Sequence, residues 1–148
     1  MMDVLLKPMT KEDIPFIAEL ERECFSSPWT EKGLTEELTN ENAVFFTARK
    51  SGEVVGYMGM HCVLDECYIA NVAVSDRERR QGIGRQLLRC AEEKARERDC
   101  SFISLEVRVS NEGAIALYCS EGYEKIGERR NFYSSPTENA LIMTKYLR

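Results

Sequence analysis

The sequence predicts a mixed α/β fold in a single domain that spans residues 1–148. Three observations lead to this prediction. A β-rich hairpin occupies the first half of the chain, a strand, helix, strand unit occupies the middle, and 43% of the residues are apolar. Two strands joined through a helix in one sheet run parallel, so the sheet should contain a parallel pair near the middle of the chain.

The first elements should be a short strand over residues 5–9 and two helices. Thr10, with Asp13 three residues later, is suited to cap a helix over Lys11–Cys24. Its apolar stripe runs through Ile14, Ile17 and Leu20. After the interruption at Ser26–Trp29, Thr30 should cap a short helix over Glu31–Thr39. In that helix Leu34 and Leu38 are expected to face inward.

The later elements alternate between strands and helices. Lys50–Glu53 contains turn residues and joins a predicted hairpin. Gly122 is suited to end the second of the later helices. The predicted strands cover Ala43–Arg49, Val54–Val63, Cys67–Val74, Phe102–Val107, Tyr123–Arg130 and Ala140–Leu147, and the helices cover Gly84–Arg98 and Gly113–Glu121.

Composition excludes several classes of function. A net charge of −5 argues against non-specific nucleic-acid binding, which needs a basic face, and suits a basic protein partner better. The apolar runs fall short of the roughly 20 residues that cross a bilayer, so a cytoplasmic protein without membrane contact is expected. The six cysteines show no CxxC pair or Cys/His spacing. They are interpreted as small buried hydrophobes, and no metal is expected.

The segment Arg79–Leu88 joins a strand that ends at Val74 to a helix that begins near Gly84. Unpaired N–H groups and the positive end of the helix dipole would form an anion site there. A dinucleotide fingerprint requires glycine where Leu87 stands, and the Gly-Lys-Ser/Thr ending of a P-loop is missing. From these residues alone, a tight structural turn with solvated arginines is an equally good interpretation.

The pattern Arg79-x-x-Gly82-x-Gly84 resembles the coenzyme A pyrophosphate loop of the GNAT superfamily of N-acetyltransferases. Leu105–Tyr123 (LEVRVSNEGAIALYCSEGY), Ser27–Trp29 and Asn131–Tyr133 resemble the ribosomal-protein-alanine N-acetyltransferases of the RimI type. The resemblance implies a mostly antiparallel sheet flanked by helices. Its central parallel strands would be splayed apart to admit coenzyme A.

Acetyl-CoA is the co-substrate that the resemblance implies. The pyrophosphate would lie against the loop residues Arg79, Arg80, Gln81, Gly82, Ile83, Gly84 and Arg85. The pantetheine arm would follow the strand residues Val72, Ala73 and Val74. Asn111 matches the Asn of the family's segment and would hydrogen-bond the same arm.

The resemblance makes Glu106 the general base and Tyr118 the general acid. A partly desolvated carboxylate in an apolar strand is a stronger proton acceptor, although most strand glutamates face solvent. A phenol stays protonated at neutral pH and can donate to a thiolate, although a helix tyrosine is more often a core residue. Direct attack by the amine needs no covalent intermediate, since Cys119 has no histidine partner that the sequence identifies.

The same resemblance places Trp29 and Tyr133 beside the acceptor groove, although Trp29 fits a core anchor equally well. The acidic residues Glu21, Glu23, Glu36 and Glu37 suit either a basic substrate or a solvated helix face. The predicted activity is acetylation of a protein N-terminus, namely the alanine of a ribosomal protein, by a monomer. The alternatives are acetylation of a lysine, polyamine, amino acid or antibiotic, or a coenzyme-binding regulatory module without turnover.

Overall fold

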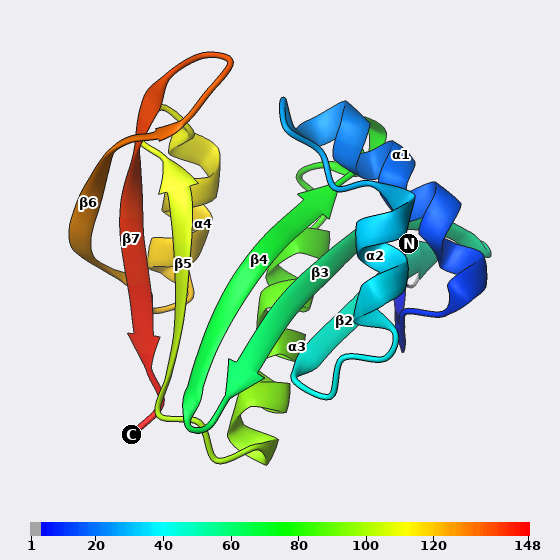
Figure 1. The fold of residues 1–148 in the computed structure, drawn as a ribbon, viewed down its shortest axis with the longest axis horizontal. Helices are drawn as coiled ribbons and strands as arrows, with labels where there is room; N and C mark the ends of the chain where they lie inside the picture. Colours follow the sequence, from blue (N-terminus) through cyan, green and yellow to red (C-terminus); the bar gives the residue numbers. More distant parts are fainter. Residues whose placement is uncertain (1–3) are drawn as a thin grey trace.

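The computed structural model describes residues 4–148, so Met1, Met2 and Asp3 lie outside the described residues. This part of the chain forms a seven-stranded sheet in the order β1-β2-β3-β4-β5-β7-β6 (Figure 1). The strands are β1 (Val4–Pro8), β2 (Ala43–Lys50), β3 (Glu53–Val63), β4 (Glu66–Val74), β5 (Phe102–Arg108), β6 (Glu124–Tyr133) and β7 (Glu138–Tyr146). Only β4 and β5 pair in parallel. The predicted mixed α/β fold is therefore confirmed.

The α-helices of the described residues are α1 (Ile14–Cys24), α2 (Glu31–Glu37), α3 (Ile83–Glu97) and α4 (Glu112–Ser120). Short 3-10 turns over Lys11–Asp13 and Asp76–Glu78 precede α1 and α3. α1 and α2 cover one face of the sheet, and α3 lies on the opposite face (Figure 1). No helix between residues 4 and 148 has the length and apolar character needed to span a bilayer.

The helix ends follow the capping residues. Asp13 Oδ2 accepts a hydrogen bond from Thr10 N at 2.8 Å, and Thr30 Oγ1 accepts one from Gly33 N at 3.0 Å. After α4 the chain turns at Gly122, whose φ of +95° lies in the left-handed region. The predicted caps at Thr10 and Thr30 and the predicted stop at Gly122 are confirmed.

Two hydrophobic cores form on the two faces of the sheet. The core beneath α3 contains the predicted helix residues Leu87, Leu88, Ala91 and Ala95. The core beneath α1 and α2 contains the predicted Ile14, Ile17, Leu20 and Leu34. Leu38 does not face inward as predicted and is 38% exposed, because α2 ends at Glu37 before the helical stripe reaches it.

The C-terminal hairpin is longer than the sequence predicts. β6 continues past Arg130 to Tyr133, and β7 begins at Glu138 rather than at Ala140. Tyr133 pairs with Glu138 beyond a register shift that starts at Arg129. The segment Asn131–Tyr133 is therefore the end of β6, beyond a bulge that the residue pattern does not reveal.

β4 and β5 separate soon after they begin. Their parallel pairing covers only Glu66–Tyr68 against Phe102–Ser104. Beyond it, β4 stays paired with β3 as far as Val74, and β5 stays paired with β7 as far as Arg108. The two strands thus form a V whose open end leads to the loop before α3 (Figure 1). This confirms the splayed parallel pair.

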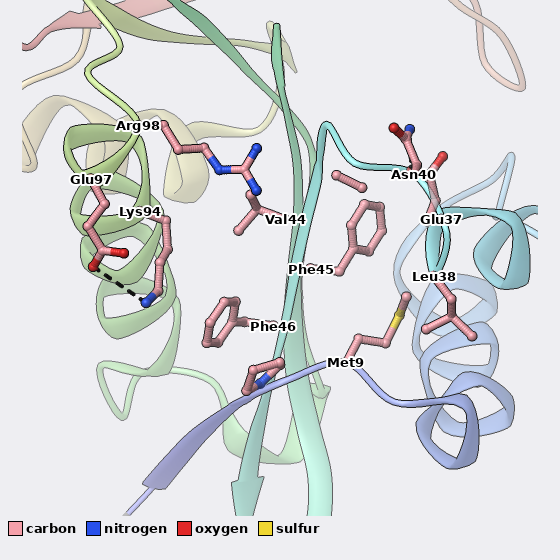
Figure 2. Close-up of a pocket in the computed structure, with 12 residues that line it drawn as sticks. Met9, Glu37, Leu38, Asn40, Val44, Phe45, Phe46, Lys94, Glu97 and Arg98 are labelled. Atoms are coloured by element: carbon pink, nitrogen blue, oxygen red, sulfur yellow. Dashed lines mark hydrogen bonds and ion pairs between the residues drawn. The ribbon is translucent and has the colours of Figure 1, made fainter.

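A shallow depression of ≈ 350 Å³ lies elsewhere, at the start of β2 (Figure 2). Lys94 and Arg98, from α3 and the residue after it, lie on one side of β2, and Leu38 lies on the other. Of the residues that the sequence relates to a ligand, this depression contains only Glu37, and none of the residues assigned to the cofactor or to catalysis lines it. The predicted site is therefore the V between β4 and β5.

Candidate active site

The loop between β4 and α3 leaves the first N–H groups of the helix unpaired. Gln86 N donates to Gly82 O at 3.0 Å, so the N–H groups before Gln86 project from the positive end of the helix. Gly82 is the N-cap with φ +81°, and no described atom lies within 4 Å of the place a Cβ would take. The helix end is therefore open to close approach by an anion.

Arg80 adopts a left-handed backbone conformation with φ +65°. This conformation costs a non-glycine residue roughly 1–2 kcal/mol. Lys50 secures the loop, since its Nζ lies 2.7 Å from Glu78 Oε2 and donates to Gln81 Oε1 at 2.8 Å. Arg80 forms no salt bridge with any residue from 4 to 148, so its charge is available to a ligand.

Other arginines near the loop already have acidic partners. Arg79 Nη1 lies 2.6 Å from Asp76 Oδ1. Arg89 Nε and Arg85 Nη1 lie 3.0 Å and 2.5 Å from the Glu121 carboxylate, and these contacts lower the pKa of Glu121. Of the arginines that the sequence assigned to the pyrophosphate, Arg85 therefore joins α3 to the end of α4, as Arg89 also does.

Gly84 and Asn111 set the position of α4 next to α3. A Cβ on Gly84 would lie 3.2 Å from Leu117 Cδ2, so glycine permits the two helices to approach closely. Asn111 is the N-cap of α4, and its Oδ1 accepts from Ala114 N at 3.2 Å. A hydrogen bond from Asn111 to the coenzyme arm would therefore use Nδ2, and it stays a prediction.

The edge of β4 that faces the V carries backbone groups that are not paired with a neighbouring strand. Ser75 N donates to Val55 O at 2.8 Å, so the backbone groups of Ser75 point toward β3. Successive residues of a strand direct these groups to opposite edges, so those of Val74 and Val72 point into the V. Val74 O accepts from Arg79 Nε at 3.3 Å, in agreement with this direction.

Glu106 lies on β5 across the V from β4. Its neighbours Leu105 and Val107 are buried in the core beneath α3, so Glu106 faces the side of α1. Its side chain is 32% exposed, and its Oε2 lies 2.7 Å from Arg129 Nε of β6. The carboxylate thus combines partial burial with access to solvent, as a general base requires.

Tyr118 projects from α4 and is 9% exposed. Burial raises the pKa of Tyr118 to about 12, with a smaller contribution from Tyr133. The Tyr118 hydroxyl has no hydrogen-bond partner among residues 4–148. In that range Tyr123 is the one tyrosine whose hydroxyl is both fully buried and unpaired. The Tyr118 hydroxyl is therefore not fully enclosed, and its raised pKa keeps it protonated at neutral pH.

Tyr133 lies at the end of β6 and is affected by charged residues of β5. Burial and, to a lesser extent, the charge of Glu106 raise the pKa of Tyr133 to about 12, while Arg108 lowers it. The guanidinium of Arg108 lies 4.6 Å from the ring centroid of Tyr133. Tyr133 is thus held against Arg108 and lies within the influence of the Glu106 charge, both on a strand that is distant in sequence.

Arg108 was not among the predicted residues, although it connects the segments that flank Trp29 and Tyr133. Its Nη2 donates to Ser26 Oγ at 3.1 Å and to Ser134 O at 2.9 Å. Its Nη1 lies 3.0 Å from Glu138 Oε1. Arg108 therefore joins β5 to the segment after α1 and to the turn between β6 and β7. The LEVR segment contains it, but its partners depend on the hairpin register.

Trp29 packs into the core rather than standing free. Its ring centroid lies 5.8 Å from that of Phe45 and 6.5 Å from that of His61. His61 Nε2 lies 2.8 Å from Glu37 Oε2, which gives His61 a structural partner. This packing supports the core-anchor interpretation of Trp29, and a contact with substrate stays a prediction.

Glu21 was interpreted as an acidic residue available to a basic substrate or to solvent, and this was wrong. It is 0% exposed and accepts hydrogen bonds from Trp29 N at 2.8 Å, Asn71 Nδ2 at 2.9 Å and the Tyr57 hydroxyl. The signal was present in the sequence, since Glu21 continues the buried stripe of Ile14, Ile17 and Ala18. Glu21 fixes the end of the α1–α2 loop against β3 and β4.

Comparisons with known proteins identify the family of this chain. The model of the acetyltransferase (GNAT) family matches residues 14–123. A Bacillus subtilis (strain 168) protein is 40% identical over 139 residues, which cover 93% of this chain and 92% of that protein. The ribosomal protein bS18-alanine N-acetyltransferase of Escherichia coli (strain K12) is 35% identical over 133 residues, which cover 88% of this chain and 89% of that protein.

A solved structure gives the same result for the fold. The crystal structure of the ribosomal-protein-S18-alanine N-acetyltransferase from Escherichia coli matches with a TM-score of 0.90 and 31% identity. The match covers 98% of this chain and 94% of that one. This chain therefore belongs to the acetyltransferase (GNAT) family and is an N-acetyltransferase that uses acetyl-CoA.

Proposed function

We propose that this chain acetylates the α-amino group of a protein N-terminus, and that its acceptor is the N-terminal alanine of a ribosomal protein. The observation that carries the proposal is the V between β4 and β5, which opens toward the start of α3 and has the half-exposed Glu106 on β5. The substrate named for the Escherichia coli relative supports the choice of acceptor. A single domain that acts as a cytoplasmic monomer fits this role.

The residues of the V fit acetyl-CoA, which supplies the acetyl thioester. The N–H groups at the start of α3 and the guanidinium of Arg80 would bind the pyrophosphate. The backbone groups of Val72 and Val74 would pair with amides of the pantetheine arm. This arrangement would hold the thioester between β4 and β5, within reach of side chains from both faces.

Glu106 would accept the proton of the attacking amine. The α-amine of a protein has a pKa of about 7.7–8.0, whereas that of lysine is about 10.4. A half-exposed carboxylate therefore deprotonates an α-amine more readily than a lysine. This difference supports an N-terminal acceptor over a lysine side chain.

Tyr118 would donate its proton to the departing thiolate. Its pKa of about 12 keeps the phenol protonated at neutral pH, and its hydroxyl has no competing partner among residues 4–148. The oxyanion would be stabilised by a backbone N–H of the β4 edge, where the N–H groups of Val72 and Val74 point into the V. Direct attack by the amine then gives the amide and free coenzyme A.

Tyr133 would line the acceptor groove together with the segment after α1. Arg108 holds these two parts in contact through Ser26 and Ser134. A groove formed by two loops admits an extended chain end, which fits a peptide better than a compact metabolite. The role of Trp29 would be to fix this loop from the core side.

The test compares acceptors with the same enzyme and acetyl-CoA. The acceptors are a peptide with a free N-terminal alanine, the same peptide with a blocked N-terminus and an internal lysine, spermidine, and free alanine. We expect release of coenzyme A only with the free-alanine peptide. Faster release with any of the other acceptors would contradict the proposed substrate class, and no release with any acceptor would contradict catalysis.

A further inference from the structure

Three buried cysteines meet at the end of β4 opposite the candidate active site. Cys62 lies on β3, Cys67 on β4 and Cys100 between α3 and β5. Their Sγ atoms all lie within 4.8 Å of one another, and the residues are 4%, 0% and 2% exposed. Cys67 lies at the closed end of the V, where β4 pairs with β5. At a strand rise of about 3.3 Å per residue, Cys67 is about 23 Å from Val74 at the open end.

The hairpin register brings Cys62 and Cys67 directly opposite each other. Cys62 N donates to Asn42 O at 2.8 Å, so its backbone groups point toward the β2 side. Cys62 and Cys67 therefore form a non-hydrogen-bonded pair, in which the Cα atoms lie about 4.5 Å apart and the side chains are close. Both thiols enter the core beneath α3.

The end of α3 turns Cys100 toward this pair. Asp99 has φ +57°, Asp99 N donates to Arg96 O at 3.0 Å, and Cys100 N donates to Ala95 O at 3.0 Å. These two bonds form the Schellman arrangement, in which the residue after the left-handed position packs back on the helix. Cys100 is therefore held against the core by the helix terminus.

The hairpin turn is tied to the same segment. Ser101 N donates to Asp65 O at 2.6 Å, and Ser101 Oγ donates to the same oxygen at 3.1 Å. The strand pair that carries Cys62 and Cys67 is thereby fixed against the residue after Cys100. The three thiols are held together by backbone contacts that do not depend on the thiols themselves.

We propose that Cys62, Cys67 and Cys100 form a three-coordinate thiolate site for a soft metal ion, with Cu(I) as the ion that fits best. Three sulfurs that are each about 2.3 Å from one ion in a trigonal plane lie about 4 Å apart. The observed limit of 4.8 Å requires only a small inward movement. Thiolate ligands select Cu(I) and zinc over harder ions.

The number of ligands separates these two ions. The cluster contains three cysteines and no fourth cysteine, histidine or carboxylate from the described residues. Structural zinc is almost always bound by four ligands, so the site suits Cu(I) better. Binding releases one proton from each thiol and leaves a net charge of −2 on the metal and its ligands. The guanidinium of Arg98 interacts electrostatically with Cys62 and offsets part of this charge.

The primary experiment uses the wild-type chain and Cu(I) alone. The reduced protein is titrated anaerobically with Cu(I) in competition with a chromophoric Cu(I) chelator, and native mass spectrometry then determines the composition of the product. We expect one copper per chain, with the loss of three protons. X-ray absorption should show three sulfur ligands. Fewer than three sulfurs, or no retention against the chelator, would overturn the proposal.

Variants identify the ligands. Cys62→Ala, Cys67→Ala and Cys100→Ala should each weaken Cu(I) binding by about 100-fold or more, by analogy with the losses seen when metal sites are altered. Cys90→Ala is the buried control from the same core, and Cys119→Ser is the exposed control. Both controls should keep full affinity. Loss of binding in Cys119→Ser instead would assign the copper to surface thiols and overturn the site.

Folding and ion choice are checked separately. Acetyl transfer by each variant reports that the fold is intact, because the cluster lies at the closed end of the V away from Glu106 and Tyr118. A titration with Zn²⁺ should give weaker retention than Cu(I). Retention of Zn²⁺ with affinity equal to that of Cu(I) would contradict the three-coordinate assignment.

Discussion

The Nε atom of Arg129 lies 2.7 Å from Oε2 of Glu106, so the proposed general base has a cationic partner from the neighbouring hairpin. The two side chains are 57% and 32% exposed. A half-exposed ion pair contributes only about 0–1 kcal/mol, so an approaching amine can replace the guanidinium at little cost. The pair orients the carboxylate and leaves it available to accept a proton.

Replacement of Glu106 by Gln should lower kcat by about 10²- to 10⁴-fold, because general base catalysis contributes that range. Acetyl-CoA affinity should change little, since the coenzyme would lie against the α3 loop. Arg129→Gln is the matched control, because it removes the ion-pair partner and keeps the base. Its decrease in kcat should be much smaller than that of Glu106→Gln. Steady-state kinetics of both variants decide this, and equal losses would mean that Glu106 acts only through its ion pair.

Tyr118→Phe should slow turnover by roughly 10²-fold while acetyl-CoA binding is retained. A general acid works in its protonated form, and the pKa of Tyr118 is about 12, so kcat of the wild type should show no decline due to Tyr118 until the pH approaches that value. The control is Tyr123→Phe, which removes a buried hydroxyl without a partner. That variant should keep its activity and its Tm. An activity loss in Tyr123→Phe as large as in Tyr118→Phe would reduce both to packing residues.

Gly82→Ala should weaken acetyl-CoA binding, because its Cβ would stand where the pyrophosphate approaches the helix end. Gly52 provides a close control. It has φ +83°, nothing within 4 Å of an added Cβ, and a place in the β2–β3 turn. Gly52→Ala and Gly82→Ala should therefore lose similar stability, roughly 1–2 kcal/mol. Calorimetry should show reduced coenzyme affinity for Gly82→Ala alone, and equal affinities would refute the loop assignment.

The stability contributed by Glu21 should depend on pH. Burial raises the pKa of Glu21 from its ordinary value of 4.5, against the lowering effect of three hydrogen bonds. A raised folded-state pKa gives stability that is present below the unfolded pKa and is lost as the pH rises through the folded value. Glu21→Gln has no charge to titrate. The variant should therefore gain stability relative to the wild type as the pH rises from about 4 to about 8.

Urea unfolding at several pH values measures this difference. Glu19→Gln is the control, because Glu19 lies on the exposed side of the same helix. Its difference from the wild type should stay constant with pH. The burial argument would be contradicted if the difference in unfolding free energy between Glu21→Gln and the wild type were equally independent of pH. It would also be contradicted if the wild type became the more stable of the two as the pH rises.

Local signals in the sequence located most elements. Thr10 and Thr30 stand at the starts of helical segments, where their side chains suit an N-cap. Gly122 follows the end of α4, where its backbone adopts a positive φ. The place of Gly82 between a strand and a helix suggested either an anion site or a structural turn, and the anion site stays a prediction. The extension of β6 to Tyr133 was missed, because it depends on a bulge that only pairing with β7 reveals. The splayed pair came from the family resemblance and not from residue patterns.

The side chains that local sequence patterns did not identify depend, in the same way, on contacts between distant segments. Arg108 acquires its role from Ser26 and Ser134, which lie far away in sequence. The cysteine cluster depends on a two-residue hairpin turn that sets Cys62 opposite Cys67. The strand bounds predicted from the sequence left a longer turn. Four of the six cysteines are buried as predicted, whereas Cys119 is exposed and Cys24 is half-buried. Glu21 alone could have been found from helical periodicity.

The most direct test of the account is the location of the acetyl group on an intact acceptor. Purified ribosomal protein bS18 with a free N-terminal alanine is incubated with the enzyme and acetyl-CoA, and tandem mass spectrometry then maps the modified nitrogen. We predict one acetyl group, on the α-nitrogen of the first residue, and its absence when Glu106→Gln replaces the wild type. Acetylation confined to lysine ε-nitrogens, or no acetylation of the protein, would contradict the central claim.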